Sequence, residues 1–151
     1  MRPTNNIGYL IQRLAFVLGR QSDQVLQEQL GIGLSQFKIL MVLGWHSSVQ
    51  QRQIADNLGQ TEASISRQIK LLKDKGLLTT EISPSNRREH ITRPTAKGQR
   101  LSEKAIEVLN DYHAPMFARL RDKQQAELLE SLTVMYDFAC MTEKPHSITK
   151  K

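Results

Sequence analysis

Hydrophobic residues recur at helical spacing in two short segments near the middle of the chain, and they predict two helices there. The first covers residues 51–58, with its apolar positions on one face and Gly59 directly after it. The second begins after Thr61, a favourable N-cap residue, and ends at Gly76. Because only a short turn separates the two helices, the pair is typical of a helix-turn-helix.

After Gly76 the pattern changes from helical spacing to residues that favour strands. Residues 77–82 (LLTTEI) and 89–93 (EHITR) are predicted strands, and residues 83–88 (SPSNRR) form the turn between them. Pro84 presets the backbone of that turn. A helix-turn-helix followed directly by a β-hairpin is a winged helix, an arrangement that favours DNA binding.

Longer amphipathic segments flank this core on both sides. We expect a single, mainly α domain over residues 1–151, with a winged helix-turn-helix core at about residues 34–94 and a small β-hairpin as its wing. Residues 5–29 and 95–141 are predicted dimerisation helices. The N-terminal segment carries more apolar surface than one small domain needs, which indicates a seam with a second copy. The alternative is an amphipathic helix folded onto its own domain.

Local residues set the ends of the first two helices. Asn5 or Asn6 can cap the N-terminal helix. The apolar run of residues 34–45 predicts the second helix, capped by Ser35 or Gly33, with the tryptophan at its end in the core.

The remaining boundaries follow from single residues. Ser47–Gln50 is expected to be a short connector into the helix-turn-helix. Pro115 lies inside the long C-terminal helical pattern and is expected to kink or interrupt it. Asp122 is expected to start the last helix, with Gln125 completing a capping box.

The outward face of the second short helix is a candidate for contact with the DNA major groove. Ile65, Ile69 and Leu72 point into the domain, and the opposite side carries small or polar residues: Ala63, Ser66, Arg67, Lys70 and Asp74. Small residues allow close approach, and Arg67 can reach a guanine edge or a phosphate. Alone, this face is equally consistent with an ordinary solvated helix surface.

Paired arginines at the tip of the predicted hairpin suit a narrow minor groove, where negative potential is concentrated. A charged loop tip alone is usually solvated, but its position after a helix-turn-helix favours DNA contact. The candidate DNA-binding residues are Thr61, Ala63, Ser64, Ser66, Arg67, Lys70, Ser85, Asn86, Arg87 and Arg88.

The placement of charge supports this interpretation. The chain has a net charge of +6, and residues 67–100 alone hold nine Lys/Arg against three Asp/Glu. The rest of the chain has equal numbers of each sign. All the excess positive charge therefore falls on the second short helix, the wing and the start of the next helix, as expected for a surface that binds phosphates.

The same region resembles the core of the multiple-antibiotic-resistance repressor (MarR) family. The matching features are the turn Leu58–Gly59, the arginine at position 67, the stop Lys75–Leu77, the pair Arg87–Arg88 and the helix start Thr95–Gly98. The resemblance implies a dimeric winged-helix regulator of bacterial transcription whose terminal helices interlock between protomers. It also implies a possible small-molecule effector, since members often bind aromatic anions, although no residue here identifies an effector site.

Three positions depart from the family pattern. Asn86 stands where an aspartate usually precedes the arginines, Pro94 where a leucine is usual, and Gln50 where a hydroxyl cap is usual. These departures affect the expected geometry of the wing, not the fold.

Enzymatic, metal and cofactor chemistry is not indicated. The four histidines have no paired spacing, a single cysteine cannot form a CxxC site, and no phosphate-binding or nucleophile motif occurs. We therefore expect no catalytic residue, no metal site and no cofactor. Cys140 lies among apolar residues and is expected to be unreactive, with a disulfide across a dimer axis as the alternative.

The sequence thus predicts a homodimeric, sequence-specific repressor of transcription. Its partners would be double-stranded DNA with a pseudo-palindromic site, a second copy of the chain and a small, aromatic effector. The alternatives are a winged-helix module that binds protein or RNA, and a redox-responsive regulator acting through Cys140. The concentration of charge favours DNA. The absence of a signal-peptide pattern and the single cysteine favour a reducing, cytoplasmic setting.

Overall fold

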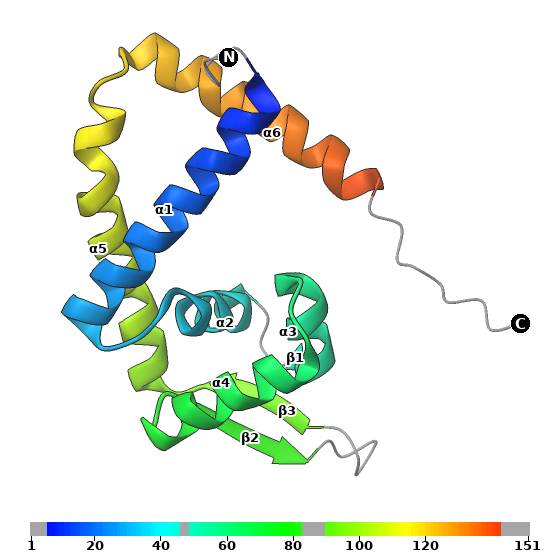
Figure 1. Ribbon diagram of the computed structural model, residues 1–151. Helices are drawn as coiled ribbons and strands as arrows, with labels where there is room; N and C mark the ends of the chain where they lie inside the picture. Colours follow the sequence, from blue (N-terminus) through cyan, green and yellow to red (C-terminus); the bar gives the residue numbers. More distant parts are fainter. Residues whose placement is uncertain (1–5, 46–48, 83–89, 143–151) are drawn as a thin grey trace, which may run out of the picture. The chain divides into compact units, whose positions relative to one another are not determined.

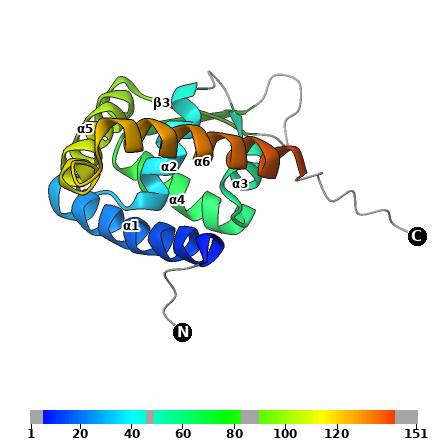
Figure 2. The same cartoon turned by 90° about the horizontal axis from the view of Figure 1, so that it is seen from above.

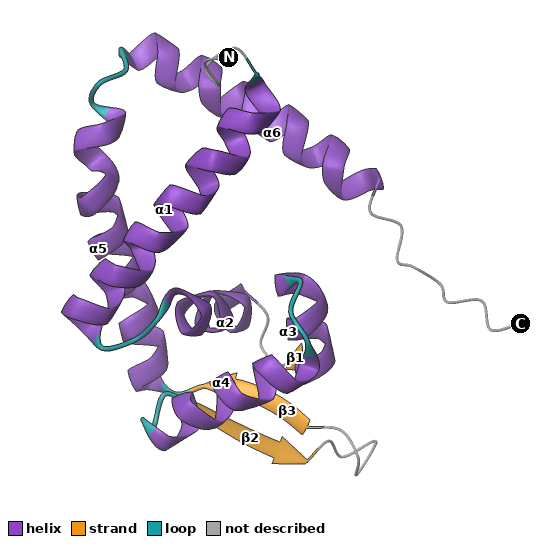
Figure 3. Cartoon of the chain, in the orientation of Figure 1, coloured by secondary structure: helices purple, strands orange, loops and turns teal. Residues whose placement is uncertain are grey.

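The computed structural model describes residues 6–45, 49–82 and 90–142. Six helices and three strands lie in these ranges (Figures 1 and 3), in the order α1 (Ile7–Leu30), α2 (Leu34–Trp45), β1 (Val49–Gln50), α3 (Gln51–Leu58), α4 (Glu62–Asp74), β2 (Leu78–Ile82), β3 (His90–Pro94), α5 (Ala96–Phe117) and α6 (Asp122–Thr142). The chain divides into two compact units, one ending at Tyr112 and one beginning at His113.

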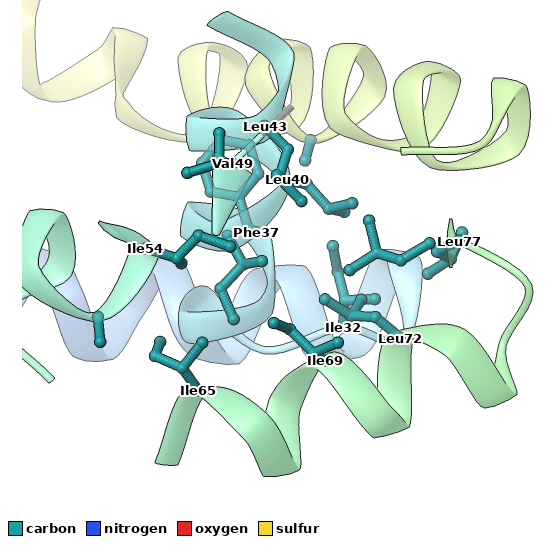
Figure 4. Packing of buried hydrophobic residues seen from close by; sticks show 14 of the residues in the cluster. Ile32, Phe37, Leu40, Leu43, Val49, Ile54, Ile65, Ile69, Leu72 and Leu77 are labelled. Carbon is teal, nitrogen blue, oxygen red and sulfur yellow. The ribbon is translucent and has the colours of Figure 1, made fainter. Parts of the chain in front are cut away.

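The core of the first unit is built around α2. This helix contacts α1, α3, α4 and β3, and Figure 2 shows α1 along one side of it. Because neighbours contact α2 on several sides, eight of its twelve residues are apolar. The close-up in Figure 4 shows side chains from these elements converging on one cluster, which comprises Leu26, Ile32, Phe37, Ile39, Leu40, Leu43, Val49, Ile54, Ala55, Ile65, Ile69, Leu72, Leu77, Leu78 and Ala105.

The predicted helix-turn-helix is confirmed as α3 and α4. Gly59 ends α3 with a left-handed backbone (φ 59°), a conformation that glycine adopts without strain. The side-chain oxygen of Thr61 accepts a hydrogen bond from the Ser64 amide at 3.2 Å and so caps α4. Ile69, like the other inward residues of α4, is at most 2% exposed.

The sheet has three antiparallel strands in the order β1–β3–β2. Strands β2 and β3 form the predicted hairpin, and Thr80 is paired with Thr92. The expected connector Ser47–Gln50 is wrong at its end, because Val49 and Gln50 pair with β3 as strand β1. A two-residue strand is too short to show an alternating pattern, so no periodic signal indicates it.

The starts of α1 and α2 test the predicted caps. Asn6 caps α1, since its side chain accepts a hydrogen bond from the Tyr9 amide at 2.9 Å. At the start of α2, the Leu34 amide donates to Asp23 Oδ1 of α1 at 2.8 Å. Of the two predicted caps, Ser35 lies inside α2, whereas Gly33 directly precedes the helix and its carbonyl accepts from the Phe37 amide at 3.0 Å. The side-chain acceptor for the Leu34 amide comes from another helix, which local sequence cannot show. The side chain of Trp45, at the end of α2, lies outside the described part of the structure, so its place in the core stays a prediction.

The turn after α4 is locked to the first turn of α5. The Thr95 amide donates to the Leu77 carbonyl at 3.0 Å, and the Thr95 hydroxyl donates to the Gly76 carbonyl at 2.8 Å. Gly98 lies so close to Leu77 that a methyl group on Gly98 would overlap the Leu77 carbonyl oxygen. Two of the motifs that carry the family resemblance, Lys75–Leu77 and Thr95–Gly98, therefore lie at one structural junction.

Pro115 does not interrupt α5, which continues to Phe117, because a proline this close to the end of a helix removes one internal hydrogen bond without stopping the last turn. The alternative, a kink at Pro115, stays a prediction. The predicted capping box of Asp122 and Gln125 is wrong: the Arg121 amide donates to Gln124 Oε1 at 3.1 Å, and an arginine side chain cannot accept the second hydrogen bond of a capping box. The side chain of Gln125 instead donates to carbonyls preceding α6.

We predict that Gly98→Ala destabilises the protein by about 1–3 kcal/mol, because the added methyl group forces the backbone at Leu77 to move. Gly44→Ala is the matched control: a methyl group at this exposed helical glycine meets no atom within 4 Å. It should stabilise the fold by about 0.5–1 kcal/mol. Urea unfolding of both variants measures the difference, and equal stability of the two variants would contradict the tight contact.

Candidate nucleic-acid interface

The outward face of α4 presents four of the predicted DNA-binding residues together. The side chains of Ala63, Ser66, Arg67 and Lys70 are all exposed, on the side of the helix opposite its buried residues. The face is narrow at its N-terminal half, where the small residues lie, and positively charged from position 67 onward. A surface of this shape can enter a groove with its cations near phosphates or base edges.

The two other predicted residues of this helix help to build it. The Thr61 side chain caps α4 through the Ser64 amide, as described above. The Ser64 side chain is half-buried, and its hydroxyl donates to Gln60 Oε1 at 3.2 Å. Both residues lie at the N-terminal end of α4, and their oxygen atoms already have partners within the protein.

Gln60 is a residue of this site that the sequence analysis missed. Its Nε2 atom donates to the Ser35 hydroxyl at 3.2 Å, and its Oε1 atom accepts from Ser64. One side chain in the helix-turn-helix turn therefore joins the start of α2 to the first turn of α4. Hydrophobic periodicity carries no information about a polar contact between residues 25 positions apart, so no signal in the sequence indicated it.

A hollow of about 370 Å³ lies between α4 and the hairpin strand β2. It is lined by Gln51, Ser66, Ile69, Lys70, Lys73, Thr80 and Ile82. Lys73 was not among the predicted residues, although its position three residues after Lys70 places it on a neighbouring part of the helix surface. The hollow brings two lysines and a serine of α4 to the side that faces the wing.

The cations of α4 are not neutralised by ion pairs among the described residues. Within that part of the chain, the two salt bridges are Lys104–Glu107 and Lys123–Glu127, on α5 and α6. Arg67, like the lysines of α4, therefore keeps its charge available for an anionic partner. The concentration of positive charge predicted from the sequence thus includes an exposed cationic helix face.

The predicted contacts at the hairpin tip cannot be placed. Ser85, Asn86, Arg87 and Arg88 lie outside the described residues, and their contact with DNA stays a prediction. Among the described residues, no group of three or more His, Cys, Asp or Glu side chains could hold a metal ion. No helix in the described part of the chain is long and apolar enough to cross a membrane. Cys140 is exposed, and its expected lack of reactivity stays a prediction.

A second hollow lies on α1. It has a volume of about 800 Å³ and is lined mainly by residues 13–24 of this helix and by Leu34. The exposed ring of Phe16 lies in it, with the guanidinium carbon of Arg13 at 5.5 Å and that of Arg20 at 6.0 Å from the ring centroid. Such a pair of cation–π contacts places two positive charges around one aromatic surface.

Comparison with known proteins agrees with this geometry. Residues 30–89 match a family model described as MarR family. The HTH-type transcriptional repressor Rv2887 of Mycobacterium tuberculosis (strain ATCC 25618 / H37Rv) is 28% identical over 126 residues, which cover 83% of this chain and 90% of that protein.

Solved structures show the same fold. Wild-type MarR from E. coli in its apo form aligns with a TM-score of 0.78 and 21% identity, over 86% of this chain and 96% of that one. MepR of S. aureus, in a complex with DNA, aligns with a TM-score of 0.71 and 22% identity, over 87% and 97% of the two chains. The chain therefore shares the winged helix-turn-helix fold of these MarR-family proteins, and its residues 30–89 match the model of that family.

Proposed function

We propose that this protein is a homodimeric, sequence-specific repressor whose helix α4 reads the major groove of a pseudo-palindromic operator. The observation that carries this proposal is the outward face of α4, which is exposed, small at its N-terminal half and positively charged beyond it. The related MepR has been crystallised with DNA. Arg87 and Arg88, at the hairpin tip, are proposed to enter the minor groove beside each half-site.

Arg67 is the residue proposed to give sequence specificity. It is exposed, it has no ion pair among the described residues, and it follows the small side chains that allow close approach to the bases. A guanidinium group can form two hydrogen bonds with the O6 and N7 atoms of guanine. A phosphate contact would instead contribute to the binding of any DNA sequence.

We predict that Arg67→Ala weakens binding to the cognate duplex by about 1–3 kcal/mol and weakens binding to random duplexes much less. The cognate duplex is obtained by selection from a random-sequence pool with the wild-type protein. Arg119→Ala, which removes an exposed arginine from the second unit, is the matched control and should change neither affinity. Equal losses on both duplexes would show that Arg67 contacts phosphate only.

The proposed dimer rests on apolar surface that the single chain leaves uncovered. On α1, Ile7 is 70% exposed and Leu14 is 51% exposed. On α6, Leu129 and Phe138 are each about 70% exposed, and no described side chain of that helix is buried. Monomeric proteins rarely leave apolar surface of this extent in water. A second copy, related by a two-fold axis, would cover the same faces on both chains.

We predict a particle of about twice the chain mass of 17.2 kDa by light scattering at micromolar concentration. The double variant Leu129→Glu/Phe138→Glu should shift the particle toward the monomer, since burial of each large apolar side chain contributes about 1.5–3 kcal/mol. Lys123→Glu, an exposed charge change on the same helix, should leave the mass unchanged. A wild-type protein that scatters as a monomer would overturn the proposed dimer.

The hollow on α1 is the proposed site of a small aromatic anion that relieves repression. The Phe16 ring offers a stacking surface, and Arg13 and Arg20 each hold a guanidinium group over it. An aromatic carboxylate combines the two features that these side chains recognise. A neutral aromatic compound of the same size would use only the stacking surface.

We predict that 4-hydroxybenzoate binds at least tenfold more tightly than 4-hydroxybenzyl alcohol in calorimetric titration, because only the former carries a carboxylate. The variant Arg13→Ala/Arg20→Ala should remove this preference. Addition of 4-hydroxybenzoate should weaken DNA binding by the wild-type protein but not by this variant. Arg119→Ala is the control for the loss of one exposed arginine elsewhere. Equal binding of both compounds by the wild type would contradict an anion site here.

A further inference from the structure

Lys75, at the C-terminal cap of α4, is directed toward the end of another helix. Its ammonium group donates to the Gly31 carbonyl at 2.5 Å. Gly31 is the C-terminal cap of α1 and has a left-handed backbone (φ 67°). The carbonyl groups at a helix end lack internal partners and carry partial negative charge, so an ammonium group is well placed there.

Lys97 makes the same kind of contact with the C-terminal end of α4. It lies in the first turn of α5, and its ammonium group donates to the Lys75 carbonyl at 2.9 Å. The C-terminal ends of α1 and α4 therefore each receive one ammonium group, from Lys75 at the end of α4 and from Lys97 of α5 respectively. Two hydrogen bonds join α5 to α4 and α4 to α1.

The location of these lysines separates them from the proposed DNA-reading residues. Lys75 follows Arg67 by eight positions, which is about 12 Å along a helix axis. A recognition helix contacts bases chiefly with its N-terminal residues. Charge count alone would place Lys75 and Lys97 among the nine cations of the phosphate-binding surface, but both ammonium groups are held by backbone carbonyls.

We infer that Lys75 and Lys97 are positioning residues that hold the recognition helix α4 between α1 and α5, and that they do not neutralise DNA phosphates. This inference rests on the proposed DNA-binding function. Loss of either ammonium group removes one of the contacts that hold the C-terminal end of α4, beside those of Thr95 with Gly76 and Leu77, so that the outward residues of the helix are held less firmly in one orientation. Sequence-specific contacts need that orientation, whereas the attraction between cations and phosphates tolerates its loss.

The test compares Lys75→Met and Lys97→Met with Lys70→Met, which removes a lysine from the outward face of the same recognition helix. Affinity is measured against salt concentration for a duplex selected by the wild-type protein and for a random duplex of equal length. The temperature is kept well below the unfolding midpoint of every variant. Lys75→Met and Lys97→Met should bind the selected duplex at least fivefold more weakly, with unchanged random-duplex affinity and unchanged salt slope. Lys70→Met should lower the log–log slope by about 0.9 per protomer.

A slope lowered by about 0.9 per protomer in Lys75→Met or Lys97→Met would overturn the inference, and so would unchanged affinity for the selected duplex. Hydrogen exchange gives a readout that needs no DNA. The Gly76 and Leu77 amides bond to carbonyls in the last turn of α4, so they should exchange faster in Lys75→Met. Unchanged exchange would also overturn the inference. If the wild type selects no sequence from the pool, the proposed function fails, while hydrogen exchange still decides whether the lysines hold α4.

Discussion

The close contact between Gly98 and the Leu77 carbonyl is the constraint on which the winged helix depends. A side chain at position 98 would hold the first turn of α5 away from the end of α4. Thr95 can donate to the Gly76 carbonyl because that separation is absent. The recognition helix ends at this point, strand β2 leaves it, and strand β3 returns to it before α5. The helix and the hairpin proposed to contact two grooves of DNA are thus fixed to one junction.

Elements that bury one face were predictable from the sequence, and contacts between distant residues were not. The limits of α2 and the buried face of α4 follow from apolar spacing, because burial selects the same positions that periodicity reveals. Strand β1 has only two residues, and α2 is capped by Asp23 from another helix. The hydrogen bond between Arg121 and Gln124 lies one residue before the predicted capping box, since neighbouring polar residues offer similar acceptors.

The residues of the candidate nucleic-acid interface also include some that were predictable from the sequence and one that was not. Ala63, Ser66 and Lys70 were predictable as exposed because the opposite face of their helix is apolar. Gln60 was not, because its role depends on Ser35, which folding brings to it from 25 positions earlier. Cys140 is exposed, as are the large apolar residues near it on α6, and its apolar neighbours in the sequence could not show this, because apolar residues at helical spacing do not say which surface covers them.

The positively charged side chains of α4 and of the first turn of α5 therefore act in two different ways. Arg67 and Lys70 have no ion pair among the described residues and lie on the outward face of α4, so their charge can act on a ligand. The ammonium group of Lys75 donates to the end of α1, and that of Lys97 donates to the end of α4. A count of cations treats all four alike and overstates the number available to phosphates. The second pair acts on DNA through the orientation of the first, because a rigidly held arginine can distinguish bases and a loosely held one detects mainly charge.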